Sequence, residues 1–315
     1  MLTHRAVLLD SRPAPLLADG MAPTLGRQRA AVIVSGGGST SPFTTPEAAC
    51  AVGLAAGNTD TALRAALLDA GITTFTAPVT VGDGEAIADP GWSGFAEPPA
   101  VLPSNMTIDS VGDVEESAAC LARFLGHLHE QYGVREVDIV AHSLGGVIAR
   151  SAHMQIRSSG APVQIISITS IGTPWLGSFV RHYDLESMPM PEPAASFAYS
   201  LMGHIRQGGR LVAEAAAPPL WSAGKEHGLD GLALTRIAGT YFTGDGEPYP
   251  HDGMASRTSV FAVEADPVVF PPASCHEVPD VHSISFARVM DLDWERSITW
   301  DPRVMDLVVA AIARV

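Results

Sequence analysis

Short apolar segments alternate along this chain with segments whose apolar residues recur at three- and four-residue spacing. The apolar segments, each expected to form a strand, are residues 30–35, 72–79, 136–141, 163–171, 232–242 and 258–263. The helical spacing covers residues 58–70, 113–132, 147–157 and 302–315. Strands that alternate with helices in this way predict a mostly parallel central sheet with helices on both faces, an α/β fold.

One long segment between two predicted strands departs from this alternation. Residues 175–231 are rich in methionine, aromatic residues and proline, and they are too many and too apolar for a simple connection. We therefore expect residues 1–174 and 232–315 to form the core, and residues 175–231 to be inserted as a lid or cap. Its apolar residues would either form an adaptable pocket for substrate or only pack the insertion against the core.

A serine stands where one predicted strand meets a helix. Residues 137–150 read VDIVAHSLGGVIAR, so the small residues Ala141 and Gly145 flank Ser143 two positions away. This is the G-x-S-x-G pattern with alanine in the first place. A serine on such a tight turn is exposed at the carboxyl edge of the sheet, and bulky neighbours would clash there. Ser143 could merely cap a helix, but its place between a strand and a helix favours a nucleophile.

The AHSLGG sequence and the SIGTPWLGS sequence after the next strand resemble the α/β-hydrolase lipases. That group includes bacterial triacylglycerol lipases and relatives of lecithin-cholesterol acyltransferase and of the inositol deacylases. The resemblance covers residues 30–178 and implies the α/β-hydrolase fold, with a lid, and an ester substrate. Because the turn at residues 172–178 lines the site in this family, the resemblance implies substrate contacts by Trp175 and Leu176. We expect His142 to contribute too.

Two backbone N–H groups are expected to stabilise the oxyanion. One belongs to Leu144, at the start of the helix after Ser143, where the helix dipole is positive. The other is expected from the SGGGS loop after the first strand, with Gly37 as donor and Gly38 beside the substrate. The same glycines could bind phosphate, but the lysine of that motif is absent.

The acid and the base should follow the serine in the sequence, the acid first. The HDGM sequence resembles the turn that carries the acid in bacterial lipases, which favours Asp252 over Asp245 and Asp266. For the base, His282 fits the family's position just before a helix or apolar segment better than His276 does. Both choices stay open at this point.

Composition and charge narrow the range of partners. The chain has 34 acidic and 19 basic residues and a formal net charge of −15, which argues against nucleic acid and anionic membrane surfaces as partners. Three cysteines cannot all pair, and no Cys/His cluster suggests a metal, so neither metal nor cofactor is expected. We see no secretory signal and no apolar run of about 20 residues, and we expect a cytoplasmic location without stable membrane insertion.

The leading hypothesis is a serine hydrolase without a cofactor, acting on a small-molecule carboxylic ester with a hydrophobic acyl or alcohol group. A second hypothesis uses the same triad for acyl transfer, thioester cleavage or cyclisation of a biosynthetic intermediate. A third is a binding protein that kept the fold without catalysis. The sequence does not indicate the oligomeric state.

Overall fold

Six parallel strands form the central sheet of the computed structural model, which describes residues 28–47, 60–86, 100–208, 228–263 and 265–315. The strand order is β2-β1-β5-β6-β7-β8. These strands are β1 (Arg29–Val34), β2 (Thr74–Thr76), β5 (Glu136–His142), β6 (Gln164–Ile171), β7 (Ala233–Gly239) and β8 (Ser274–Val278). Two short strands, β3 (Val79–Thr80) and β4 (Ile108–Asp109), pair with each other in parallel.

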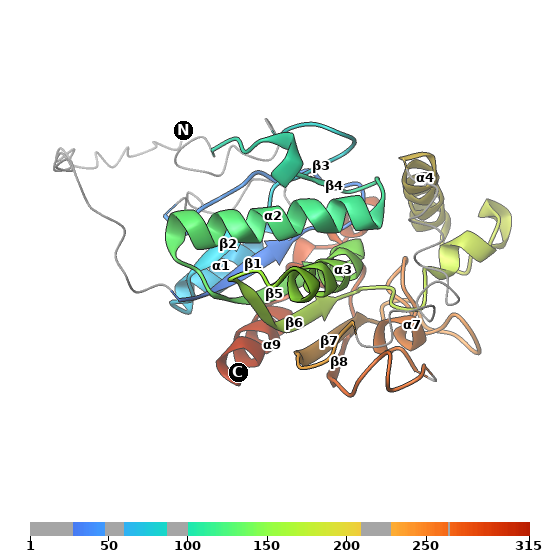
Figure 1. Cartoon of the computed structure of the whole chain (residues 1–315). Coiled ribbons are helices and arrows are strands. Elements are labelled where there is room, and N and C mark those ends of the chain that lie inside the picture. Colours follow the sequence, from blue (N-terminus) through green and yellow to red (C-terminus); the bar gives the residue numbers. More distant parts are fainter. Residues whose placement is uncertain (1–27, 48–59, 87–99, 209–227, 264) are drawn as a thin grey trace, which may run out of the picture.

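Helices cover both faces of this sheet (Figure 1). The α-helices are α1 (Thr61–Asp69), α2 (Val114–Tyr132), α3 (Leu144–Ser159), α4 (Glu192–Gly208), α7 (Arg257–Phe261), α8 (Ile284–Val289) and α9 (Pro302–Ala313). Short 3-10 helices are η2 (Ser104–Met106), η3 (Phe179–His182), η4 (Leu185–Ser187) and η5 (Trp294–Arg296).

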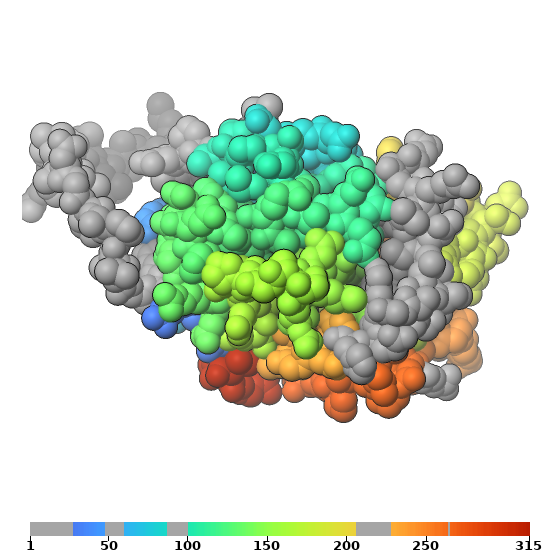
Figure 2. Space-filling view, in the orientation of Figure 1, coloured from blue at the N-terminus to red at the C-terminus, as the bar shows by residue number. Residues whose placement is uncertain are grey.

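Successive residues of a strand face opposite sides of the sheet, so the core consists of two main apolar clusters, one on each side. Val32 and Ile139 belong to the cluster that α2 and α3 bury. Ile33 and Val140, their neighbours in sequence, belong to the cluster on the opposite face, under α1 and α9. Figure 2 shows α2 and α3 covering much of the near face of the molecule. The α/β fold expected from the sequence is therefore confirmed.

Helix α2 begins and ends at capping residues that can be recognised in the sequence. Asp113 is its N-cap, and the carboxylate accepts backbone N–H groups of Glu115 at 2.8 Å and Glu116 at 3.0 Å. Gly133 ends the helix with φ 69°, a left-handed conformation that glycine adopts without a Cβ clash. The predicted range 113–132 is therefore confirmed. The start of the predicted helix 58–70 lies outside the described residues, and α1 itself begins at Thr61.

The prediction for residues 258–263 is wrong, because this segment is the short helix α7 and not a strand. Ser256 caps it by accepting the N–H of Ser259 at 3.2 Å, and Val260 on its buried side packs against Ala238 of β7. The last strand of the sheet is instead β8, which has no apolar run because it is an edge strand with mostly exposed side chains. In the part of the chain that is described, no helix is long and apolar enough to cross a membrane.

Candidate active site

Ser143 occupies the sharp turn between β5 and α3. Its backbone has φ 51° and ψ −126°, a strained conformation for a residue with a side chain. The close packing around this turn explains its small residues. A Cβ on Gly145 would lie 2.5 Å from the carbonyl oxygen of Val34, and a Cβ on Gly36 would lie 2.7 Å from the Cβ of Ser143. The turn thus presents the hydroxyl of Ser143 at the carboxyl edge of the sheet.

The structure brings the side chain of His282 to this hydroxyl. The imidazole Nε2 lies 2.9 Å from Ser143 Oγ, and the Nδ1 lies 2.7 Å from Asp252 Oδ2. His282 stands on the loop between β8 and α8, and Asp252 stands on the loop after β7. The side chains of His282 and Asp252 are 4% and 0% exposed, so water has little access to this contact.

The Asp252 carboxylate is held by its own loop. Its Oδ1 accepts the backbone N–H groups of Met254 at 2.8 Å and Ala255 at 2.7 Å, which leaves Oδ2 for His282. The backbone carbonyl of Asp252 also accepts the N–H of His282 at 2.9 Å. Because both residues are fixed by main-chain contacts, the imidazole has one well-defined orientation.

The alternative acids and the alternative base lie elsewhere. Asp245 and Asp266 are exposed on loops, and Asp266 accepts the backbone N–H of Val268 at 2.9 Å. His276 is on β8, where it pairs with Ile237 in the sheet. Among the residues that the structure describes, no group of three or more His, Cys, Asp or Glu side chains could hold a metal ion.

His142 contacts the backbone and the ring of His282. Its Nε2 lies 2.9 Å from the carbonyl oxygen of His282, and since a carbonyl can only accept, Nε2 is the donor. The two rings lie 4.8 Å apart between centroids. Burial, and then the nearby His282, hold the pKa of His142 well below its usual value, so this ring is neutral. A neutral His142 does not repel the positive charge that His282 would gain as a base.

A cavity of about 200 Å³ lies at Ser143. Its polar side includes Gly37, Gly38 and Ser283, and its apolar side comes mainly from α4. Phe197, Leu201 and Ile205 lie four residues apart on that helix and all line the cavity. Phe197 is one of the aromatic residues from which we expected an apolar pocket, but Leu201 and Ile205 were not expected there. The helical spacing of the three residues was a signal that could have identified them.

Helix α4 contacts the glycine loop directly. A Cβ on Gly38 would lie 2.8 Å from Leu201 Cδ1, and a Cβ on Gly37 would lie 3.0 Å from Ile205 Cδ1. Figure 1 shows α4 apart from the two helical layers, at the right of the view. Both Cδ1 atoms are the ends of flexible side chains, which can shift, but the φ of 73° at Gly38 favours glycine there.

Trp175 and Leu176, which we expected to contact substrate, do not line this cavity. Trp175 is 1% exposed, and its indole N–H donates to Ser170 Oγ at 3.3 Å inside the core. The Leu176 backbone N–H donates to Ser259 Oγ at 3.1 Å. The turn at residues 172–178 is thus held by contacts with β6 and α7, and we correct the expectation for these two side chains.

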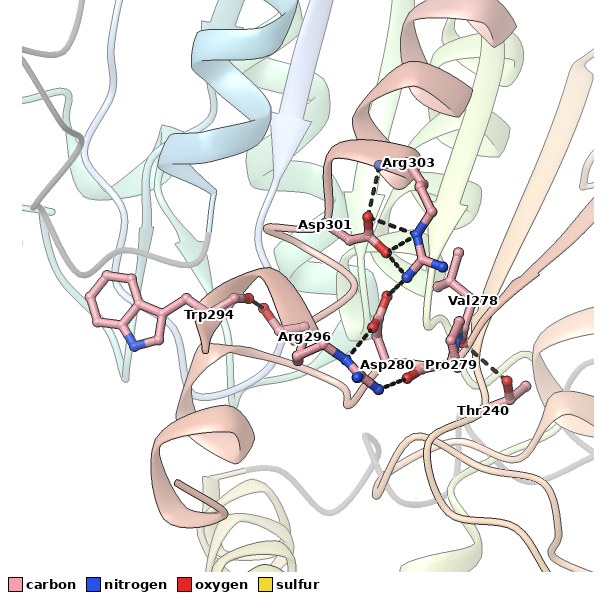
Figure 3. A network of polar contacts seen from close by, with 9 residues as sticks. Thr240, Val278, Pro279, Asp280, Trp294, Arg296, Asp301 and Arg303 are labelled. Atoms are coloured by element: carbon pink, nitrogen blue, oxygen red, sulfur yellow. Dashed lines mark hydrogen bonds and ion pairs between the residues drawn. The ribbon is translucent and has the colours of Figure 1, made fainter. Parts of the chain in front are cut away.

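An ionic network around a buried carboxylate lies in the segment just before His282 (Figure 3). Asp280 is fully buried and lies 3.3 Å from the guanidinium groups of both Arg296 and Arg303. Arg303 also forms a closer ion pair with Asp301, at 2.5 Å. Burial, and then the neighbouring Asp301, raise the pKa of Asp280 to about 7. This network was not predicted from the sequence, because Asp280, Arg296 and Arg303 lie on different elements and no local pattern links them.

One region of the chain matches the model of a described protein family. Residues 101–204, which include Ser143, match the family described as "Putative serine esterase (DUF676)". No curated protein matches the chain.

Solved structures, among them a lipase and a carboxylesterase, resemble the chain over most of its length. The mature lipase BlEst2 of Bacillus licheniformis is 14% identical with a TM-score of 0.45, over 91% of this chain and 94% of that one. The lin2722 product of Listeria innocua is 14% identical with a TM-score of 0.47, over 91% and 95%. The carboxylesterase EstE1 from a metagenomic library is 14% identical with a TM-score of 0.47, over 93% and 82%.

We assign the fold from the geometry of this chain itself. Its central sheet is parallel, and a strained serine links the central strand β5 to α3. Residues 101–204, with their match to a serine esterase family, contain that turn. The chain has the α/β-hydrolase fold.

Proposed function

We propose that this protein hydrolyses carboxylic esters with Ser143 as nucleophile, His282 as general base and Asp252 as the acid that orients the base. One observation carries this proposal: the imidazole of His282 lies within hydrogen-bond distance of both Ser143 Oγ and Asp252 Oδ2. A nucleophile, a base and an orienting carboxylate in this arrangement are what acyl transfer to serine requires.

The reaction would proceed in two halves. His282 Nε2 accepts the proton of the Ser143 hydroxyl as Oγ bonds to the acyl carbon, and it then gives that proton to the departing alcohol. Water enters, and His282 takes one of its protons as the water oxygen bonds to the acyl carbon. His282 then gives that proton to Ser143 Oγ as the bond between Oγ and the acyl carbon breaks, which releases the acid and restores the hydroxyl. Asp252 keeps the proton on Nδ1 of His282, so that Nε2 is free to accept.

The oxyanion would be stabilised by the backbone N–H groups of Leu144 and Gly37. Leu144 is the first residue of α3, and the first N–H groups of a helix have no acceptor within the helix. Gly37 lines the cavity at Ser143, next to Gly38. Loss of one such donor typically costs about 10²–10³ in rate.

The lining of the cavity favours a substrate with a hydrophobic group. It also favours a role for residues 175–231 as a cap, because α4 lies in this segment. Phe197, Leu201 and Ile205 give one wall an apolar surface, and Met254 adds to it from the Asp252 loop. The glycine loop and several hydroxyl side chains also line the cavity. We therefore assign the acyl chain to the wall formed by α4.

Hydrolysis of p-nitrophenyl esters of increasing acyl length tests this function. We expect turnover that rises from acetate toward medium chains and that is lost in Ser143→Ala. Product analysis with an added alcohol separates hydrolysis from acyl transfer, because a transferase would form the new ester in preference to the free acid. No turnover of any ester, in a folded protein, would contradict the proposal.

A further inference from the structure

The glycine loop proposed to hold the oxyanion is flanked by two buried serines that share one carboxylate. Ser35 follows β1, and Ser41 stands six residues later, at the other end of the loop. Their hydroxyl oxygens are 2.8 Å apart. Both hydroxyls donate to the same oxygen of Asp60, Ser35 in a short contact and Ser41 at 3.4 Å. The carboxylate therefore joins the two ends of the loop.

The side chain of Asp60 does not serve the helix at whose start it stands. Asp60 occupies the N-cap position of α1, where aspartate is favoured because its carboxylate accepts a helix N–H. Here the side chain makes no capping hydrogen bond and instead faces the two serines. Asp60, Ser35 and Ser41 are only 2%, 1% and 1% exposed. A buried carboxylate is costly unless it is hydrogen-bonded, so these contacts hold it in place.

Independent contacts fix the rest of the loop, so its ends and middle are all anchored. The backbone of Ser41 exchanges two hydrogen bonds with Val79 of β3, at 2.9 and 2.8 Å. Ser110 Oγ donates to the carbonyl of Ser39 at 2.9 Å. Gly36, between these anchors, lies against Ser143 so closely that no Cβ would fit. The amides proposed to hold the oxyanion therefore lie on a loop that is anchored on both sides, and the side chains of Ser35 and Ser41 are part of these anchors.

We propose that Asp60 is a positioning residue for the oxyanion: through the hydroxyls of Ser35 and Ser41 it sets the conformation of the Gly36–Gly38 loop. This inference rests on the proposed esterase function. Asp60 acts on the transition state, in which the substrate oxygen is charged, and not on ground-state binding. Misplacing an oxyanion donor by about 1 Å can cost about 100-fold in rate.

The test compares Asp60→Ala, Asp60→Asn and the double variant Ser35→Ala/Ser41→Ala in the full chain. We expect kcat to fall about 10- to 100-fold in Asp60→Ala, with KM nearly unchanged. Affinity for a trifluoromethyl ketone, which forms a charged tetrahedral adduct, should fall by the same factor. Asp60→Asn keeps an acceptor oxygen for the serines and should retain most of the activity.

Asp69→Ala is the matched control, because this exposed acid lies on the same helix. If Asp60 acts through the serines, adding Ser35→Ala/Ser41→Ala to Asp60→Ala lowers kcat no further. Should Asp60→Ala fail to fold, the double serine variant makes the same comparison.

Wild-type kcat in Asp60→Ala, or a loss confined to KM, would overturn the inference while the esterase function stands. A wild-type protein that neither turns over esters nor reacts with a fluorophosphonate would contradict the function itself.

Discussion

His282 Nε2 lies 2.9 Å from Ser143 Oγ, although 139 positions separate the two residues in the sequence. The parallel sheet explains this proximity. Ser143 follows β5 and His282 follows β8 after a short loop, and parallel strands end at the same edge of a sheet. The contact is therefore a property of the whole fold and depends on correct assembly of the C-terminal half.

Replacing the orienting acid tests the order Ser143–His282–Asp252. In Asp252→Asn the amide can donate to Nδ1 of His282, which favours the tautomer with the proton on Nε2, facing Ser143. We expect kcat to fall by about 10⁴. Asp245→Asn, at an exposed loop position, is the control and should keep wild-type kcat. A loss below about tenfold in Asp252→Asn would argue that this carboxylate does not orient the base.

The two histidines considered from the sequence can be separated by substitution. His282→Ala should lower kcat by several orders of magnitude, because Ser143 then lacks a base. His276→Ala should leave kcat within about twofold of wild type, because His276 is a strand residue paired with Ile237. Steady-state kinetics on one p-nitrophenyl ester measures both, and the opposite ranking would contradict the assignment.

Substitutions on α4 should change the preferred acyl length. Leu201→Trp adds bulk to the apolar wall of the cavity, so we expect kcat/KM for medium chains to fall about tenfold relative to acetate. Leu201→Ala should shift the preference toward longer chains. Tyr199→Ala on the same helix is the control, because Tyr199 is 45% exposed. An unchanged chain-length profile in both Leu201 variants would place the acyl chain elsewhere.

The buried Asp280 should make stability depend on pH. Burial raises the pKa of Asp280 to about 7, above the ordinary carboxyl value of 3.8, so the folded protein holds this proton more tightly than the unfolded chain. The contribution is present at low pH and is lost as the pH rises from about 4 through about 7. The lowered pKa of the neighbouring Asp301 acts in the opposite direction, but below this window.

Thermal unfolding between pH 5 and pH 8 measures this effect. We expect the Tm of the wild type to fall across the range relative to that of Asp280→Asn, which cannot lose a proton. Asp306→Asn, an exposed acid on α9, should follow the wild type. Parallel curves for the wild type and Asp280→Asn would show that Asp280 does not titrate in this range.

The sequence predicted the parts of the site whose signal is local. Ser143 was recognisable because a strand, small residues and a helix follow one another within 14 residues. The strained backbone conformation of Ser143 occurs at such a turn between a strand and a helix. Asp252 and His282 were harder to assign, since their turn sequences also suit inert loops. The structure separates them from their alternatives by position alone: Asp245 is exposed, and His276 is a strand residue.

Other features were not predicted, because they depend on tertiary contacts that leave no local pattern in the sequence. Edge strand β8 was missed because only one neighbour pairs with it, so it needs no apolar run. The family resemblance implied a substrate contact by Trp175, but its ring is buried in the core, where it packs against Phe270. The expected cytoplasmic location, the absence of a cofactor and the extent of the cap at residues 175–231 stay predictions.

The most direct test of the central claim is the mass of the intact protein after reaction with a fluorophosphonate, followed by peptide mapping. A fluorophosphonate reacts with a serine hydroxyl whose proton is taken by a nearby base. We predict one covalent addition, on the peptide that contains Ser143, and none in Ser143→Ala. Labelling at another residue, or no labelling of the folded wild type, would contradict the account.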